Sequence, residues 1–366
     1  MEANKSNRIF YFDALRALAI FCVICIHVYC EIQGGIMHDY ALIPSYKWFY
    51  AQIMGNCFRI GVPLFLMLSG ALLLGRNESL KEFLHKRLPR IVVPFIFWGF
   101  VLSVILIILA YVFGYEGFIF IKSFDLYGIS RFIFRAYLAK SSSFEPYWFF
   151  WTIFGIYLLM PVINKLFKNP DFEKMEYFLV IWLITCLITY TLKISIPFGL
   201  DYFAGPIGFV VLGYYLRCTE RKLLNNPRFA ILLILLSAVS MILLSWCLSS
   251  TKMTYNFDRY TILVAIEAIG VFLLFKNFDK FNLKLNFIRN PDSIIHKLIS
   301  SLAKHSYGIY LTHAPLILII LGAIPNFSQH VNLFTVSMLV MALVVPWFIM
   351  VVLDKIPVVN RLIGSK

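Results

Sequence analysis

Long apolar runs recur along the whole chain, with short polar segments between them. A run of about 20 mostly apolar residues is long enough to cross the hydrocarbon core of a bilayer as a helix. The pattern therefore predicts an all-α, polytopic integral membrane protein with about ten transmembrane helices. The predicted spans are residues 9–30, 52–75, 91–113, 147–166, 177–195, 203–217, 229–249, 260–276, 306–323 and 333–353. The mixed, aromatic stretch 116–145 indicates an interfacial helix or a re-entrant segment outside that count.

The domain organisation predicted from this pattern is simple. We find no internal repeat, low-complexity stretch or soluble domain, so we expect residues 1–366 to form a single membrane domain. The first apolar run extends from Ile9 to about Cys30, longer than the 7–15 residues or so of a signal-peptide core. We therefore expect this run to be retained as the first span.

Composition agrees with a membrane fold and excludes an ordinary soluble one. The chain is 60% hydrophobic and 14% charged, whereas a globular domain is about half apolar and about a quarter charged. The net charge of +14 does not indicate a nucleic-acid partner, because the basic residues lie in short loops between apolar runs. Cys22 and Cys25 lie inside the first apolar run without a second ligand pair, so we expect packing cysteines and no metal.

The distribution of basic residues predicts the orientation. If the N-terminus is cytoplasmic, the inside segments carry 23 of the 33 Lys and Arg residues, and the outside segments carry 8. The other two, Arg16 and Arg59, lie within spans. Because short cytoplasmic loops are enriched in Lys and Arg, we expect both termini in the cytoplasm.

Three ionisable residues lie in the first span, namely Asp13, Arg16 and His27. Ionisable groups inside a bilayer are costly and mark functional sites by default. At about 100° per residue, Arg16 and His27 lie within about 20° of the same helix face and about 16 Å apart along the axis. Asp13 shares that face. A pairing of Asp13 with Arg16 for assembly, with His27 as a packing residue, is an equally good interpretation from physics alone.

Other polar residues lie in later spans. Arg59, near the outer end of the second span, can snorkel, while Ser69, beside Gly70, allows close backbone approach. Glu267 lies near the middle of the eighth span. Tyr310 and His313 share a face of the ninth at spacing i, i+3. These residues exceed what packing alone requires.

A basic cluster precedes the third span. Lys86, Arg87 and Arg90 lie at its cytoplasmic entrance. Two arginines three residues apart can present two guanidinium groups to one phosphate. Topological anchoring is the commoner use of such residues.

Five motifs follow one another along the chain. They are Arg16 and His27 with ten residues between them, Val62-Pro63-Leu64-Phe65 followed by Ser69-Gly70, Arg87-Leu88-Pro89-Arg90 with Pro94, Tyr147-Trp148-Phe149 followed by Pro161, and Ser306-Tyr307-Gly308-Ile309-Tyr310-Leu311-Thr312-His313. The ordered set, from residue 8 to about 315, resembles the acyltransferase-3 family of bacterial membrane acyltransferases. We see no appended extracellular esterase-like domain, which some members carry.

The resemblance implies acyl transfer, of acetyl or succinyl, from cytoplasmic acyl-CoA to a hydroxyl of a cell-surface polysaccharide or lipid-linked glycan precursor. Acetyl-CoA is the expected donor, and the bacterial cytoplasmic (inner) membrane the expected location. His27 is implied as the base and Arg16 as its catalytic companion, with Arg87 and Arg90 beside Lys86 for the donor. Asp13, Arg59, Ser69, Trp148, Glu267, Tyr310 and His313 are expected as substrate-binding or supporting residues.

Simple chemistry agrees with these roles. A neutral imidazole at His27 can take the proton of an attacking hydroxyl, and a low-dielectric site favours the neutral form. Arg16 can hold a phosphate or stabilise negative charge. The alternative is a transporter or flippase of a small polar solute or glycan precursor, because polar stripes and proline-broken helices suit both classes. Such transporters have repeated halves, and none is found in this chain.

Overall fold

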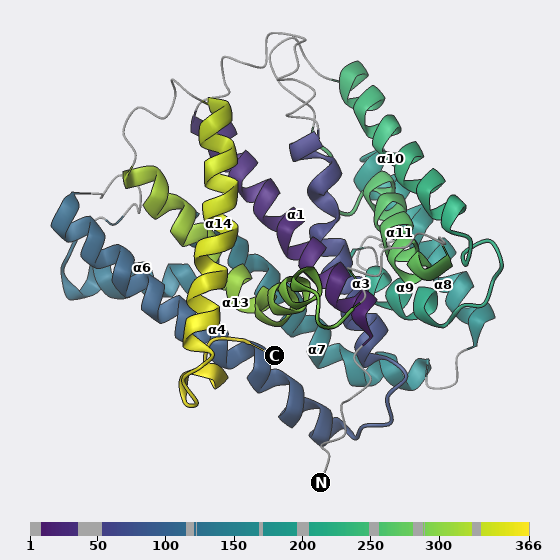
Figure 1. The fold of residues 1–366 in the computed structure, drawn as a ribbon, viewed down its shortest axis with the longest axis horizontal. Helices are drawn as coiled ribbons and strands as arrows, with labels where there is room; N and C mark the ends of the chain where they lie inside the picture. Colours follow the sequence, from purple (N-terminus) through teal and green to yellow (C-terminus); the bar gives the residue numbers. More distant parts are fainter. Residues whose placement is uncertain are drawn as a thin grey trace. The chain divides into compact units, whose positions relative to one another are not determined.

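The structure is a computed structural model that describes residues 9–35, 53–114, 121, 123–167, 171–195, 205–248, 256–280, 288, 290–323 and 331–365. All regular elements within these ranges are helical, as the ribbon in Figure 1 shows. The predicted all-α class is therefore confirmed. Internal contacts divide the chain into two compact units. Unit 1 comprises Met1–Cys22, Ala41–Gly75 and Phe167–Lys304, and unit 2 comprises Val23–Tyr40, Arg76–Leu166 and His305–Lys366.

Each predicted span coincides with a helix. The matching helices are α1 (Phe10–Gly35), the short η2 (Cys57–Ile60) with α3 (Gly61–Leu73), α4 (Leu80–Phe113), α7 (Trp148–Leu166), α8 (Phe172–Thr185) with the π-helix η4 (Cys186–Thr191), α9 (Pro206–Cys218), α10 (Pro227–Leu248), α11 (Ile262–Lys276), α13 (Ile294–Ala323) and α14 (Val331–Leu353). The shorter elements are η3 (Ser142–Tyr147), η6 (Phe278–Lys280) and η8 (Val359–Arg361).

The number of membrane crossings is confirmed only in part. Six helical segments of the described residues are long and apolar enough to cross a bilayer. They are Phe10–Cys30, Ile53–Leu73, Leu80–Phe113, Leu126–Leu166, Pro227–Leu248 and Thr335–Leu353. The apolar helix α9 is shorter, with 13 residues. The count of ten spans therefore stays a prediction.

The structure moves the start of two predicted spans and resolves one alternative in part. The ninth predicted span begins at residue 306, but α13 already begins at Ile294. The third predicted span begins at residue 91, but α4 already begins at Leu80, capped by the Ser79 hydroxyl, which accepts a bond from the Glu82 amide. Its 34 residues extend about 51 Å, more than the ~30 Å hydrocarbon core. In the mixed stretch 116–145 a helix is present, α6 (Leu126–Tyr137), which buries Phe132 and exposes Arg131.

In unit 1, α3 and α9 pack at very short range because each presents a glycine to the other. A Cβ added at Gly70 would lie 1.7 Å from the Val210 carbonyl oxygen, and one at Gly213 would lie 1.9 Å from that of Met67. The close approach predicted beside Ser69 is therefore confirmed. Figure 1 also shows α10 and α11 of this unit side by side, where Gly270 faces Ile234.

In unit 2, aromatic side chains join α4 to α6 and α7. Phe95 stacks on Phe150 with ring centroids 3.6 Å apart, and the Tyr137 hydroxyl donates to the Ile96 carbonyl at 2.6 Å. The helix α13 is tied to α4 where the Tyr307 hydroxyl donates to the Ile91 carbonyl at 2.7 Å. These contacts hold α13, which carries two predicted site residues, in a defined position within the unit.

Candidate active site

The centre of the candidate site is a proline-interrupted segment of α13. Pro315 has no amide hydrogen, so the carbonyl of Leu311, four residues earlier, lacks its usual helical donor. The Tyr147 hydroxyl donates to this carbonyl at 3.1 Å from the end of η3. A buried carbonyl is thereby satisfied from a second element, as buried main-chain groups require.

A second tyrosine makes the reciprocal bond. The Tyr310 hydroxyl donates to the carbonyl of Pro146, the residue before Tyr147. Both tyrosines are buried, and Tyr310 also meets Phe149 edge to face at 5.6 Å. The two hydrogen bonds join α13 to the start of α7 at two adjacent points. We call this pair of bonds the tyrosine lock.

His313 lies one turn beyond Tyr310 and is completely buried. Its Nδ1 is 2.6 Å from the Tyr310 carbonyl oxygen. A carbonyl oxygen can only accept, so Nδ1 carries the proton in a neutral ring. The lone pair of the ring is therefore on Nε2, and this atom has no hydrogen-bond partner among the described residues.

The structure brings His27 to this residue. The rings of His27 and His313 have centroids 5.0 Å apart and are inclined by 55°. His27 comes from the second half of α1 and is half-buried. Trp148, another predicted site residue, is the first residue of α7 and follows Tyr147 directly. Four predicted site residues, His27, Trp148, Tyr310 and His313, belong to unit 2, as do the predicted donor-binding residues Lys86, Arg87 and Arg90. A hydrogen bond and ring contacts join His27, Tyr310 and His313 to one another.

The other polar residues of the first helix belong to unit 1, because the division between the units falls within α1 after Cys22. The Arg16 guanidinium lies 3.7 Å from the carboxylate of Asp13, which is buried, while Arg16 itself is 27% exposed. The assembly pair considered for these two residues is therefore present. It does not exclude a chemical role for Arg16, whose side chain is still partly accessible.

Three further predicted residues also lie in unit 1. The Arg59 Nε donates to the Gly55 carbonyl at 2.6 Å, and the Ser69 hydroxyl to that of Phe65 at 2.9 Å. Glu267 is buried on α11, and its Oε2 has no hydrogen-bond partner among the described residues. The bonds of Arg59 and Ser69 are local, each to the carbonyl four residues earlier.

The basic cluster at the start of α4 is partly neutralised. Arg87 donates to the Glu78 carboxylate at 3.0 Å and is 16% exposed. Lys86 donates to Glu82 at 2.6 Å, and this bond, with the charge of Lys86, lowers the pKa of the Glu82 carboxyl. Arg90 is exposed and makes no hydrogen bond or ion pair with the described residues. The cluster therefore offers Arg90 directly, and Arg87 only when Glu78 is displaced.

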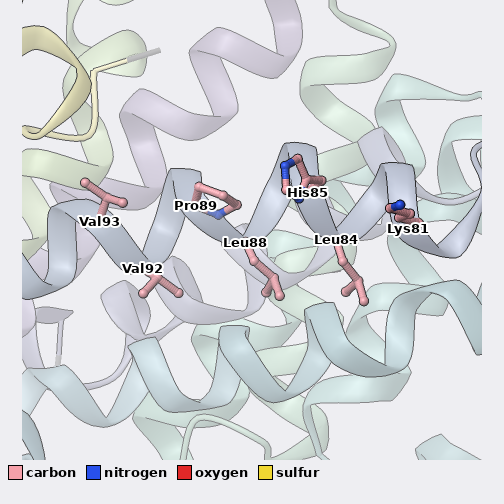
Figure 2. A pocket seen from close by; sticks show the side chains of 7 residues that line it. All are labelled: Lys81, Leu84, His85, Leu88, Pro89, Val92 and Val93. Atoms are coloured by element: carbon pink, nitrogen blue, oxygen red, sulfur yellow. The ribbon is translucent and has the colours of Figure 1, made fainter.

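A shallow hollow of about 490 Å³ also lies on α4 (Figure 2). Its lining residues come from successive turns of this one helix. They are Lys81, Leu84, His85, Leu88, Pro89, Val92 and Val93. At about 100° per residue, Arg90 is about half a turn around the helix from Lys81. The hollow is open and does not contain the predicted donor-binding residues, so we do not assign the reaction to it.

Sequence reasoning missed two residues that the structure makes important. Tyr147 was part of a motif but was not among the predicted site residues, and Glu78 was not considered. A proline four residues after Leu311 does signal a carbonyl that needs another donor. The sequence could not say which side chain provides that donor, because Tyr147 and Leu311 are 164 residues apart.

Comparisons with known proteins test the resemblance that the motifs indicate. The family model described as an acyltransferase domain, Acyl_transf_3, matches residues 9–351. A protein named "Putative acetyltransferase ORF330" from Acidianus two-tailed virus is 28% identical over 273 residues, which cover 69% of this chain and 72% of the viral protein. No solved structure matches the chain. Because the family model covers nearly the whole sequence, including every motif described above, this chain belongs to the acyltransferase-3 family.

Proposed function

We propose that this protein is a membrane O-acyltransferase. It moves an acyl group, acetyl or succinyl, from cytoplasmic acyl-CoA to a hydroxyl of a cell-surface polysaccharide or a lipid-linked glycan precursor. Family membership supports acyl transfer, and the printed name of the viral relative favours acetyl, hence acetyl-CoA as donor. The apolar helices support a location in a membrane, surrounded by lipid. The basic loops favour the cytoplasmic membrane with both termini inside.

The observation that carries this proposal is the proximity of His27 to His313. The acceptor hydroxyl oxygen attacks the thioester carbonyl, and a nitrogen of His27 takes the hydroxyl proton. The new carbon–oxygen bond forms and the carbon–sulfur bond breaks. The proton then passes from His27 to the departing CoA sulfur. The products are the acyl ester and free CoA thiol, with His27 neutral again.

The donor head is proposed to bind at the start of α4. Acyl-CoA carries several phosphate charges, and guanidinium groups bind phosphate through paired charge-assisted hydrogen bonds. Arg90 is exposed, and Arg87 and Lys86 are held nearby on the same helix by Glu78 and Glu82. In this proposal Arg16 holds a phosphate of the donor.

The proposal is tested with purified full-length protein in detergent and radiolabelled acetyl-CoA. The wild type should transfer label to an envelope glycan extract or, without acceptor, hydrolyse the thioester slowly. The His27→Gln variant keeps volume and hydrogen bonding but cannot serve as a base, so its rate should fall by about 10²–10⁴-fold. The His296→Gln variant, which alters a partly buried histidine stacked on Phe10, should transfer normally.

Two results would contradict the proposal in different ways. Near-normal turnover of His27→Gln, at equal protein level, would remove His27 as the base. Movement of a glycan precursor across proteoliposomes by wild-type protein, without thioester cleavage, would indicate the transporter alternative.

A further inference from the structure

The first observation concerns the ring nitrogens of His313. His313 Nδ1 is held by the Tyr310 carbonyl at 2.6 Å, so its proton is fixed there in the neutral ring. The remaining Nε2 can only accept a hydrogen bond. It is completely buried, and no described residue donates to it. A buried acceptor of this kind is costly unless a donor reaches it at some stage of function.

His27 is positioned to be that donor. With ring centroids 5.0 Å apart, nitrogens of the two rings that point toward each other lie within the usual hydrogen-bond distance of about 2.7–3.2 Å. His27 is half-buried, whereas His313 is enclosed. The geometry therefore provides a donor and an acceptor on facing rings.

We propose that His313 is a positioning residue that accepts a hydrogen bond from His27 and stabilises its protonated form during acyl transfer. This inference rests on the proposed function of His27 as base. When His27 takes the acceptor proton on one nitrogen, its other nitrogen still carries a proton. That proton is donated as a hydrogen bond to His313 Nε2, and it stays on His27. His313 gains and loses no proton.

This arrangement places a neutral imidazole where a hydrolytic triad has a carboxylate. The carboxylate of a triad orients the catalytic histidine and stabilises its imidazolium without being protonated. A carboxylate inside a bilayer is costly, whereas a neutral imidazole is much less so. The described geometry thus suits a membrane-embedded base better than a charged partner does.

Within unit 2, the ring of His313 is a described side chain that lies directly against that of His27. The tyrosine hydroxyls that pack here, Tyr310 and Tyr147, are both committed to main-chain carbonyls in the tyrosine lock. The lock also anchors α13 at Tyr310 and Leu311, within three residues of His313.

Two substitutions separate this role from simple packing. His313→Phe keeps an aromatic side chain and removes the acceptor, while His313→Gln supplies an amide oxygen as a neutral acceptor. We expect His313→Phe to lower kcat by about 10- to 100-fold with little change in KM for acetyl-CoA. The acidic limb of its rate–pH profile should move to lower pH by about 1–2 units, because the imidazolium of His27 loses its stabilising acceptor. His313→Gln should keep most of the rate.

The matched control is His305→Gln, which changes an equally buried histidine of the same helix that lies 3.6 Å from Asp354. Its rate–pH profile should match that of the wild type. Thermal unfolding and acetyl-CoA binding are measured for every variant.

Unchanged kcat and pH profile in His313→Phe would overturn the inference, and so would a His313→Gln variant that folds but is inactive. If the Phe variant does not accumulate, the Gln variant still decides. Absence of acyl transfer in the wild type would instead contradict the proposed function.

Discussion

At the scale of single residues, neighbours decide how available each charged group is. The motif pair Arg87 and Arg90 illustrates this. The two residues have the same chemistry and lie one turn apart, yet Arg87 is bound to Glu78 at 3.0 Å while Arg90 is exposed. Their contributions to donor binding should therefore differ, and Glu78 should control that of Arg87.

We expect Arg90→Ala to weaken acetyl-CoA binding by about 10- to 100-fold, the value of a charge-assisted hydrogen bond of about 1.5–3 kcal/mol. Arg87→Ala should have a smaller effect, because its partner Glu78 already satisfies it. Glu78→Gln should tighten binding, since it frees Arg87 and removes a negative charge. Affinities are measured by calorimetry with purified protein. Lys81→Ala, on a different side of α4, is the control. Equal affinities in all variants would leave the arginines as topological anchors.

At the scale of elements, helices in this protein depart from regularity where the site or close packing requires it. Pro315 opens the hydrogen-bond ladder of α13 beside His313, and Tyr147 compensates. Glycines bring α3 and α9 together at Gly70 and Gly213. Each departure from a regular helix is accompanied by a contact from another element. Each contact can be tested by substituting one of its two residues.

The first element-scale prediction concerns the tyrosine lock. Tyr147→Phe leaves the buried Leu311 carbonyl without a donor and should lower the free energy of unfolding by about 1–3 kcal/mol. Pro315→Ala restores the amide that can bond this carbonyl. In the Pro315→Ala background, Tyr147→Phe should therefore lower the free energy of unfolding by clearly less. The double-mutant cycle is measured by unfolding in detergent. Equal costs in both backgrounds would show that the hydroxyl acts elsewhere.

The second element-scale prediction concerns the α3–α9 contact. Gly70→Ala places a methyl group within 1.7 Å of main-chain oxygen at Val210, so the two helices must separate. We expect the free energy of unfolding to fall by at least about 3 kcal/mol, the upper range for overpacked cores. Gly155→Ala is the control, because nothing lies within 4 Å of its added Cβ. There the higher helix propensity of alanine should give no loss. A thermal-shift assay of both variants decides, and a stable Gly70→Ala protein would refute the close contact.

At the scale of the whole molecule, topology means the number of membrane crossings and the side on which each loop lies. Six helical segments of the described residues meet the length and apolarity of a span, while the alternation of basic loops predicts ten. Three of the predicted spans outside these six fall on α8, α9 and α11, which have only 14, 13 and 15 residues. In the proposed reaction, the side of the membrane from which donor and acceptor approach depends on the orientation that the basic loops predict.

This orientation can be tested in a variant without its native cysteines. Single cysteines at Asn77 and Glu220, both exposed in the structure, should resist an impermeant thiol reagent in intact cells, because both lie in predicted cytoplasmic loops. A cysteine at Asn256, exposed in a predicted outer loop, should react. Permeabilised cells should label at all three sites. Labelling of Asn77 and Glu220 in intact cells would reverse the proposed topology.

Sequence patterns alone predicted the all-helical class and the acyltransferase family, which the structure and the family model confirm, and they supplied the candidate site residues. Apolar runs and basic loops are local properties, and ordered motifs are read without coordinates. The close approach beside Ser69 was also predictable, because glycine next to a small residue indicates helix packing. The roles of His27, Arg16 and the donor-binding arginines stay predictions.

Only the tertiary structure decided which residues meet. It paired His27 with His313, which are 286 positions apart in the sequence, and supplied Tyr147 to the carbonyl left open by Pro315. It also joined Arg87 to Glu78 and left Arg90 exposed. A sequence pattern specifies the face of a helix on which a side chain lies, but not the neighbouring helix it faces. That choice depends on packing between distant segments, and it determines which nitrogen, oxygen or charge is available for chemistry.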